Sequence, residues 1–100
     1  MEKLFVYGTL KDPKLREQVL HIHVNGNRDL LTGFRLKDTR IGDEDYKIIE
    51  EDSDSSETIE GLVLELDMNK LRLLDTYEGK DYRRKKVKLA SGSEAWAYIK

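Results

Sequence analysis

Short runs of apolar residues separated by polar turns predict several strands and two helices in this chain. Residues 4–7 are continuously apolar and end at Gly8, which is typical of a buried strand that enters a turn. Asp12 before Pro13 offers an N-cap and a proline at the first helical position. This pair predicts a short helix over residues 14–20.

The middle of the chain is patterned less regularly. Residues 21–27 show only weak periodicity. Residues 30–36 predict a strand kinked at Gly33, and residues 46–49 predict another strand. Residues 59–66 alternate clearly, so that Leu62, Leu64 and Leu66 share one face of a third strand.

The last third predicts a helix followed by a hairpin. Asp67 is expected to cap a helix from Met68 to about Glu78, which Gly79 ends. Residues 82–89 and 95–99 read as two strands joined by a turn at 91–93. Because the strands and helices do not alternate as in a βαβ array, we predict an α+β fold with a small mixed, mostly antiparallel sheet around one core.

Length and composition restrict the class of protein. The chain has 100 residues and its apolar and charged shares are both 38%, which predicts one folded domain over residues 1–100. No apolar run approaches the roughly 18 residues of a membrane span, and the first residues do not form a signal peptide. We therefore expect a cytoplasmic protein without a membrane partner.

Charge and cysteine content exclude further classes. The formal net charge is −2, which argues against bulk attraction to nucleic acid or anionic membrane. The absence of cysteine excludes disulfides, thiolate nucleophiles and cysteine-ligated metals. His21 and His23 have no evident third metal ligand, and no nucleotide-phosphate motif is present. We expect neither a metal nor a cofactor.

Charges are segregated locally along the chain. Nine of the eighteen residues 43–60 are acidic, and six of the nine residues 80–88 are basic. The simplest interpretation is a solvated loop and a solvated strand face that lie near each other. The alternatives are a nucleic-acid strip over residues 83–88 and a protein-interaction surface on the acidic segment. The strip lacks the interleaved aromatic residues that stacking on bases requires.

The second predicted helix carries a carboxylate on its apolar stripe. At 100° per residue, Glu78 lies about 20° from Leu71 and about 40° from Leu74 on the helical wheel. Burial and the helix C-terminus both raise the pKa of a carboxyl group at that position. A glutamate with a raised pKa beside a pocket suits general-base catalysis near neutral pH. The alternative is a frayed last turn that turns Glu78 into water.

The neighbouring positions of this helix complete its pattern. Leu73 and Tyr77 are expected to widen the apolar arc. Asp75 lies near the stripe and is expected to have a structural role at the helix end. The solvent-exposed face of this helix is expected to consist of Asn69, Arg72 and Thr76.

The first strand leads into a second candidate segment, formed by Tyr7, Gly8, Thr9 and Leu10. A buried strand that runs into a glycine turn exposes consecutive backbone N–H groups. Such groups bind an anion or stabilise an oxyanion. Thr9 is not expected to be a nucleophile, because no base partner is evident and it is not N-terminal.

These two segments together resemble a known family. Residues 4–10, LFVYGTL, resemble the YGSL-type signature of the gamma-glutamylcyclotransferase-like, or AIG2-like, family. Residues 74–79, LDTYEG, followed by Tyr82-Arg83-Arg84 and the closing residues 95–99, look like the second half of that family. Residues 61–66 match the strand before its helix. The resemblance covers essentially the whole chain and is least diagnostic over residues 25–57.

The resemblance implies a barrel-like mixed sheet with flanking helices and an enzyme that cyclises a gamma-glutamyl amine or amide to 5-oxoproline, releasing the amine. It places the catalytic glutamate at Glu78. Thr9 stands where many members carry serine, and the short acidic middle leaves little material for a large leaving-group site. The resemblance implies a substrate-binding loop formed by Tyr7, Gly8, Thr9 and Leu10. It also implies that Tyr82 or Arg83 lines the same pocket.

Such chemistry needs no metal and no protein nucleophile, because the substrate's own alpha-amino group attacks. The resemblance therefore implies a small gamma-glutamyl molecule as the partner. The loop N–H groups are expected to hold either the substrate carboxylate or the tetrahedral oxyanion. A non-catalytic small-molecule binding domain of the same fold is the alternative function. The pattern makes no prediction of the oligomeric state or of the amine released.

Overall fold

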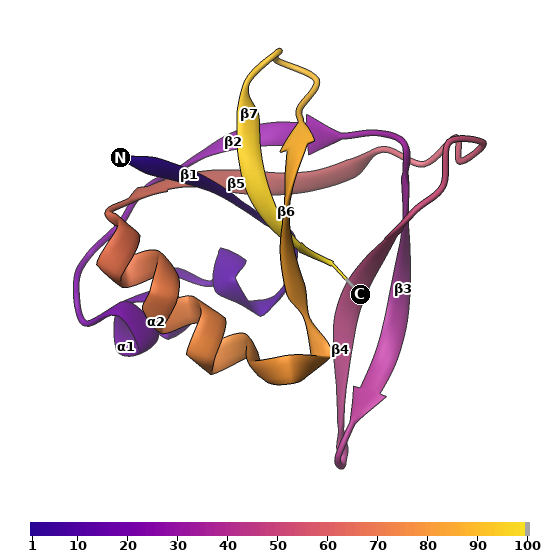
Figure 1. Cartoon of the computed structure of the whole chain (residues 1–100). Helices are drawn as coiled ribbons and strands as arrows, with labels where there is room; N and C mark the ends of the chain where they lie inside the picture. Colours follow the sequence, from indigo (N-terminus) through magenta and orange to yellow (C-terminus); the bar gives the residue numbers. More distant parts are fainter. Residues whose placement is uncertain (100) are drawn as a thin grey trace.

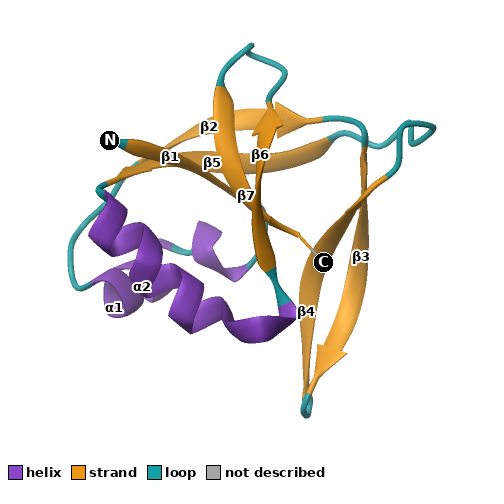
Figure 2. Cartoon of the chain, viewed as in Figure 1, coloured by secondary structure: helices purple, strands orange, loops and turns teal. Residues whose placement is uncertain are grey.

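Seven strands and two α-helices follow one another along the part of the chain that the structure describes. The structure is a computed structural model that describes residues 1–99 (Figures 1 and 2). In chain order the elements are β1 (Glu2–Val6), a 3-10 turn η1 (Thr9–Lys11), α1 (Pro13–Leu20), β2 (Gly26–Leu31), β3 (Phe34–Ile41), β4 (Glu44–Glu51), β5 (Ile59–Leu66), α2 (Met68–Glu78), a 3-10 turn η2 (Gly79–Asp81), β6 (Arg83–Lys88) and β7 (Glu94–Ile99).

The strands form two sheets. Five of them make a sheet in the order β2-β5-β1-β7-β6, and β3 and β4 pair with each other. Only the pairing of β1 with β7 is parallel among the described strands; the other pairs are antiparallel. The predicted α+β fold with a mixed, mostly antiparallel sheet is confirmed. The expected closure into a barrel is not confirmed, because no strand pairing of residues 1–99 joins the β3–β4 hairpin to the larger sheet.

Each face of the five-stranded sheet is covered by a different layer. Side chains alternate across a strand, so Leu4 and Val6 of β1 face α2 whereas Phe5 between them faces the opposite side. On the helix side they pack against Leu71 and Leu74. Figure 1 shows both helices on this face and the hairpin beyond the other. Both faces of the central strands are therefore buried.

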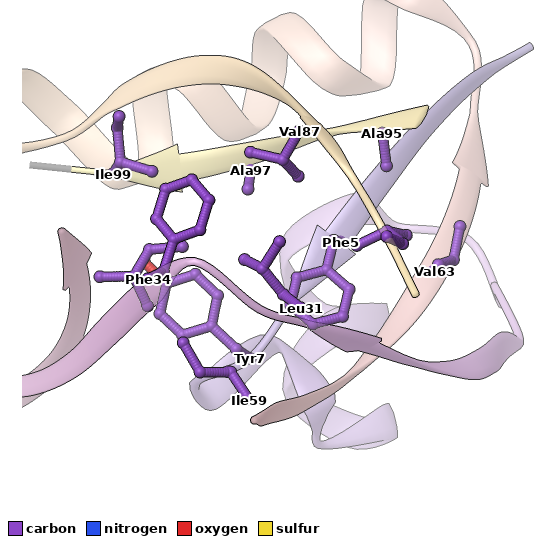
Figure 3. Close-up of a cluster of buried hydrophobic side chains, with 12 residues drawn as sticks. Phe5, Tyr7, Leu31, Phe34, Ile59, Val63, Val87, Ala95, Ala97 and Ile99 are labelled. Atoms are coloured by element: carbon purple, nitrogen blue, oxygen red, sulfur yellow. The ribbon is translucent and has the colours of Figure 1, made fainter. Parts of the chain in front are cut away.

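The core on the hairpin side joins residues that are distant in the sequence. Figure 3 shows Phe34 of β3 beside Ile99 of β7, with Tyr7 and Ile59 close by. Burial of these side chains attaches the β3–β4 hairpin to the larger sheet without backbone pairing. The hairpin thereby becomes a wall at the end of β1.

The predicted ends of both helices are confirmed. The Asp12 carboxylate accepts a hydrogen bond from the Lys14 N–H at 3.0 Å, and Asp67 caps α2 through the Lys70 N–H at 2.8 Å. Gly79 ends α2 with a φ of 75°, a conformation that favours glycine. The turn at 91–93 also forms, and it joins β6 to β7 as predicted.

Two expectations about the middle of the chain and α2 are wrong, and the strand predicted over residues 46–49 is confirmed but is too short. Residues 30–36 are not one kinked strand, since β2 ends at Leu31 and β3 starts at Phe34 in the other sheet, with Gly33 between them at a φ of 80°. β4 is longer than residues 46–49, because its outer residues pair across the hairpin. Leu73 and Tyr77 do not widen the buried arc of α2; they are exposed, because no element covers that side.

The charged segments lie near each other, as expected, but the acidic one is not simply a solvated loop, because β4 occupies much of it and buries Ile48 and Ile49. Lys85 of β6 forms an ion pair with Glu51 of β4. β6 is an edge strand of the sheet, and its charged residues blunt the pairing of that edge with other chains. In the described part of the chain, neither helix has the length and apolar character that crossing a bilayer would require.

Candidate active site

A pocket lies where the end of β1, the η1 turn, β4 and the end of α2 meet. Its cavity volume is about 40 Å³. All six site residues named from the sequence line it. The lining consists of Phe5, Val6, Tyr7, Gly8, Thr9, Leu10, Tyr46, Lys47, Glu78, Tyr82 and Tyr98.

Glu78 is the last residue of α2 and keeps a helical backbone, with φ −70° and ψ −30°. The last turn therefore stays helical, and the side chain remains on the stripe of Leu71 and Leu74. Glu78 is half-buried, and this burial raises the pKa of its carboxyl group to about 7. The carboxyl group can therefore both accept and release a proton near neutral pH.

The turn after β1 presents its backbone N–H groups at the start of a helical turn. Pairing of β1 with β5 stops at Val6, before the turn. Within the turn, the Lys11 N–H donates to the Gly8 carbonyl at 3.1 Å, and the Asp12 N–H donates to the Thr9 carbonyl at 3.0 Å. The N–H groups of Thr9 and Leu10 precede these donors and have no partner inside the turn. They are the donors available to an anion in the pocket.

Arg16 holds this turn from behind, a role that the sequence analysis did not assign. Its side chain is 4% exposed, and its Nη1 donates to the carbonyls of Leu10 and Lys11, each at 3.2 Å. Its Nε donates to the Val24 carbonyl at 2.9 Å. The only signal in the sequence is its position four residues before the buried Leu20, which places an arginine on the inward face of α1.

The Tyr7 hydroxyl bridges three elements around the pocket. It donates a hydrogen bond to the Tyr98 carbonyl of β7 and accepts one from the Ile49 N–H of β4. Burial raises the pKa of this hydroxyl well above its usual range. The Tyr7 ring lines the pocket, while its hydroxyl is occupied by the protein itself. Tyr7 thus fixes the distance between β1, β4 and β7.

Tyr7→Phe is expected to lower the free energy of unfolding by about 1–3 kcal/mol, because two buried backbone groups lose their partner. Urea unfolding followed by circular dichroism measures this change. Tyr46→Phe is the matched control, since its hydroxyl bonds only the exposed Glu44 carboxylate, and it should cost about 0.5 kcal/mol or less. Equal stability of the Tyr7 variant and the wild type would contradict the bridging role.

Of the two alternatives Tyr82 and Arg83, the structure places Tyr82 in the pocket. The Tyr82 hydroxyl donates to the Lys47 carbonyl at 3.0 Å, and burial, the larger cause, together with the nearby Glu78 raises the pKa of this hydroxyl to about 12. Arg83 lines a neighbouring hollow of about 290 Å³ on the β6 side of Tyr82. Tyr82 thus connects β4 to the end of α2.

Asp75 takes part in a side-chain network beside the pocket. Its Oδ1 accepts hydrogen bonds from the Tyr98 hydroxyl at 2.7 Å and from Arg84 Nε at 2.6 Å. The Arg84 guanidinium also lies 4.6 Å from the centre of the Trp96 ring. These contacts hold α2 against β6 and β7, in keeping with the structural role expected for Asp75.

β4 supplies two lining residues, Tyr46 and Lys47, that the sequence analysis did not connect with the site. It lies between the turn after β1 and the end of α2 only because the hairpin packs on the sheet. The sequence pattern of residues 46–49 does not indicate that the hairpin packs on the larger sheet. Lys47 also pairs with Asp38 across the hairpin.

Comparisons with known proteins identify relatives of this fold. A model of the family described as gamma-glutamyl cyclotransferase, AIG2-like, matches residues 4–100. Two Arabidopsis thaliana proteins with solution structures are 22% and 23% identical, with TM-scores of 0.82 and 0.80. A solved structure named gamma-glutamyl cyclotransferase is 18% identical, with a TM-score of 0.80.

All three structures are matched by 98% of this chain, which spans 61%, 67% and 65% of their own lengths. At these identities the structural likeness concerns the fold alone. No curated protein sequence matches the chain.

Proposed function

Because the chain belongs to the gamma-glutamyl cyclotransferase, AIG2-like family, we propose that it cyclises a gamma-glutamyl amine or amide to 5-oxoproline and releases the amine. The observation that carries this proposal is the position of Glu78. A carboxyl group whose pKa is raised to about 7 by burial lines the same pocket as the turn of residues 7–10. A base and a set of backbone donors then face one bound molecule.

The reaction needs orientation more than a strong nucleophile. The alpha-amino group attacks the gamma-carbonyl carbon, a carbon–nitrogen bond forms in the new five-membered ring, and the bond to the leaving amine breaks. Because the pocket holds the glutamyl chain folded, the entropy cost of ring closure contributes less to the activation barrier. The narrow pocket, walled by Tyr7, Tyr82 and the hairpin, supports this role.

Glu78 accounts for the protons. Its carboxylate accepts the proton that the alpha-amino group loses on attack, and the resulting carboxylic acid donates a proton to the leaving nitrogen. A pKa near 7 suits both steps, since neither the acid nor the base form is strongly favoured at neutral pH. The negative oxygen of the tetrahedral intermediate needs donors, which the N–H groups of Thr9 and Leu10 supply.

Formation of 5-oxoproline tests the proposal. The purified protein is incubated with gamma-glutamyl amides of amino acids and of simple amines, and 5-oxoproline is measured by chromatography with mass detection. Product that forms in proportion to protein, and not with heat-denatured protein, is the expected result. Tight binding of these compounds with no product would favour the non-catalytic binding domain instead.

The pH dependence of the reaction provides a more specific prediction. Glu78 acts as a base only when ionised, so kcat/KM should fall as the pH decreases through about 7, the raised pKa of the carboxyl group. The substrate amine titrates separately, because it too must lose a proton before it attacks the gamma-carbonyl. The limb near 7 should disappear from the residual activity of Glu78→Gln. If that limb persists in the variant, another group is the base.

A further inference from the structure

Among the residues that line the pocket, Lys47 is the one with a cationic side chain and Glu78 the one with an acidic side chain. The reacting end of a gamma-glutamyl substrate carries one carboxylate and one amine on the same carbon. We propose, resting on the proposed function, that Lys47 is a specificity-determining residue that binds the alpha-carboxylate of the substrate. The Lys47 ammonium group then pairs with the substrate carboxylate, and the Glu78 carboxyl group lies beside the substrate amine.

Contacts within the protein place Lys47 beside the turn. A Cβ atom added to Gly8 would lie 3.8 Å from the Lys47 Cβ, so the base of this side chain lies beside the backbone of the turn. The Lys47 carbonyl accepts the hydrogen bond of the Tyr82 hydroxyl at 3.0 Å, which holds this part of β4 against the end of α2. Lys47 is therefore held at the wall where the glutamyl group must fold.

The present partner of Lys47 can be exchanged. Its ammonium group pairs with Asp38, and the two side chains are 49% and 72% exposed. An exposed pair of this kind contributes at most about 1 kcal/mol, because water competes for both charges. A substrate carboxylate inside the pocket is less solvated and binds the ammonium group more strongly than Asp38 does. Asp38 thus competes with the substrate.

This assignment also settles what the turn binds. Once Lys47 holds the carboxylate, the N–H groups of Thr9 and Leu10 are left for the oxygen of the gamma-carbonyl. That oxygen becomes negative only in the tetrahedral intermediate, where donors lower the barrier. Loss of Lys47 should therefore weaken substrate binding and leave the chemical step nearly unchanged.

Steady-state kinetics test this with two substrates that differ in one group: a gamma-glutamyl amide with a free alpha-carboxylate, and its analogue with an alpha-carboxamide. Lys47→Met should raise KM for the carboxylate substrate about 10-fold or more, with kcat within about threefold. KM for the carboxamide should stay the same. Asp38→Asn should shift KM for the carboxylate in the opposite direction, by about twofold to threefold.

Lys37→Met is the matched control, because Lys37 pairs with Glu50 on the same hairpin at 2.8 Å and does not line the pocket. It should leave both constants unchanged. Circular dichroism verifies the fold of each variant. Equal KM values for the two substrates in the wild type, or a Lys47→Met variant that loses kcat alone, would overturn the assignment.

A binding measurement separates this inference from the proposed function. Calorimetry compares 5-oxo-L-proline with its carboxamide, and neither compound requires turnover. Stronger binding of the carboxylate by the wild type, lost in Lys47→Met, supports the assignment even if no substrate is cyclised. Binding of both compounds with equal affinity refutes it even if cyclisation occurs.

Discussion

Glu78→Gln is expected to lower the rate of 5-oxoproline formation by about 100-fold or more, because the amide keeps the size of the side chain and removes the base. The variant should fold and should still bind 5-oxo-L-proline, since Lys47 and the turn of residues 7–10 are unchanged. The initial rates of wild type and variant, at saturating substrate and pH 8, measure the loss. This is the largest effect on activity that the structure predicts.

The same variant should change how stability depends on pH. Burial raises the pKa of Glu78 to about 7 from 4.5, so the folded state favours the protonated carboxyl group. Protonated Glu78 therefore favours the folded state. This contribution to the free energy of unfolding is complete below about pH 4.5 and is lost as the pH rises through about 7. Glutamine has no such loss, so Glu78→Gln should be more stable than the wild type above pH 7, by about 1–3 kcal/mol. Urea unfolding at pH 5 and pH 8 measures the difference.

Asp75→Asn is the matched control, since it neutralises a second carboxylate on the same helix. Asp75 accepts hydrogen bonds from Tyr98 and Arg84 and does not line the pocket of Glu78. It should lower stability while retaining most of the activity. Near wild-type turnover by Glu78→Gln, or an equal loss in both variants, would contradict the assignment of Glu78 as the base.

Gly61→Ala is expected to destabilise the fold by about 3 kcal/mol or more, because the new methyl group has no space. An added Cβ would lie 2.4 Å from the Val6 carbonyl oxygen and 2.6 Å from Cζ of Phe5. Both neighbours belong to β1, next to β5 in the centre of the sheet. Relief of the clash requires a shift of the backbone that leads directly into the turn of residues 7–10.

Thermal unfolding measures the effect, which should lower Tm by more than about 10 °C in a chain of this length. Gly8→Ala is the control for an added methyl group, since its Cβ would meet only the Lys47 Cβ at 3.8 Å, an ordinary contact. Its Tm should remain within a few degrees of the wild-type value. A Gly61→Ala variant as stable as Gly8→Ala would show that β1 can move away from β5.

The sequence alone determines the local elements and one half of the site. Asp12 and Asp67 set the helix starts because an N-cap needs only a side chain and the next few N–H groups. The alternation of residues 59–66 and the stripe carrying Glu78 depend on repeat lengths within one element. These features involve neighbours in the chain, so they are readable without knowing the fold.

Tertiary packing decided the rest. Residues 30–36 are divided between two sheets, and Tyr46 and Lys47 form a wall of the pocket, because of how the β3–β4 hairpin lies on the larger sheet. Leu73 and Tyr77 are exposed because that side of α2 is left uncovered. The hairpin is held by apolar burial, which has no direction and no fixed spacing in the sequence. Residues that meet only through such packing leave no periodic signal, so the place of Lys47 became visible only in the folded chain.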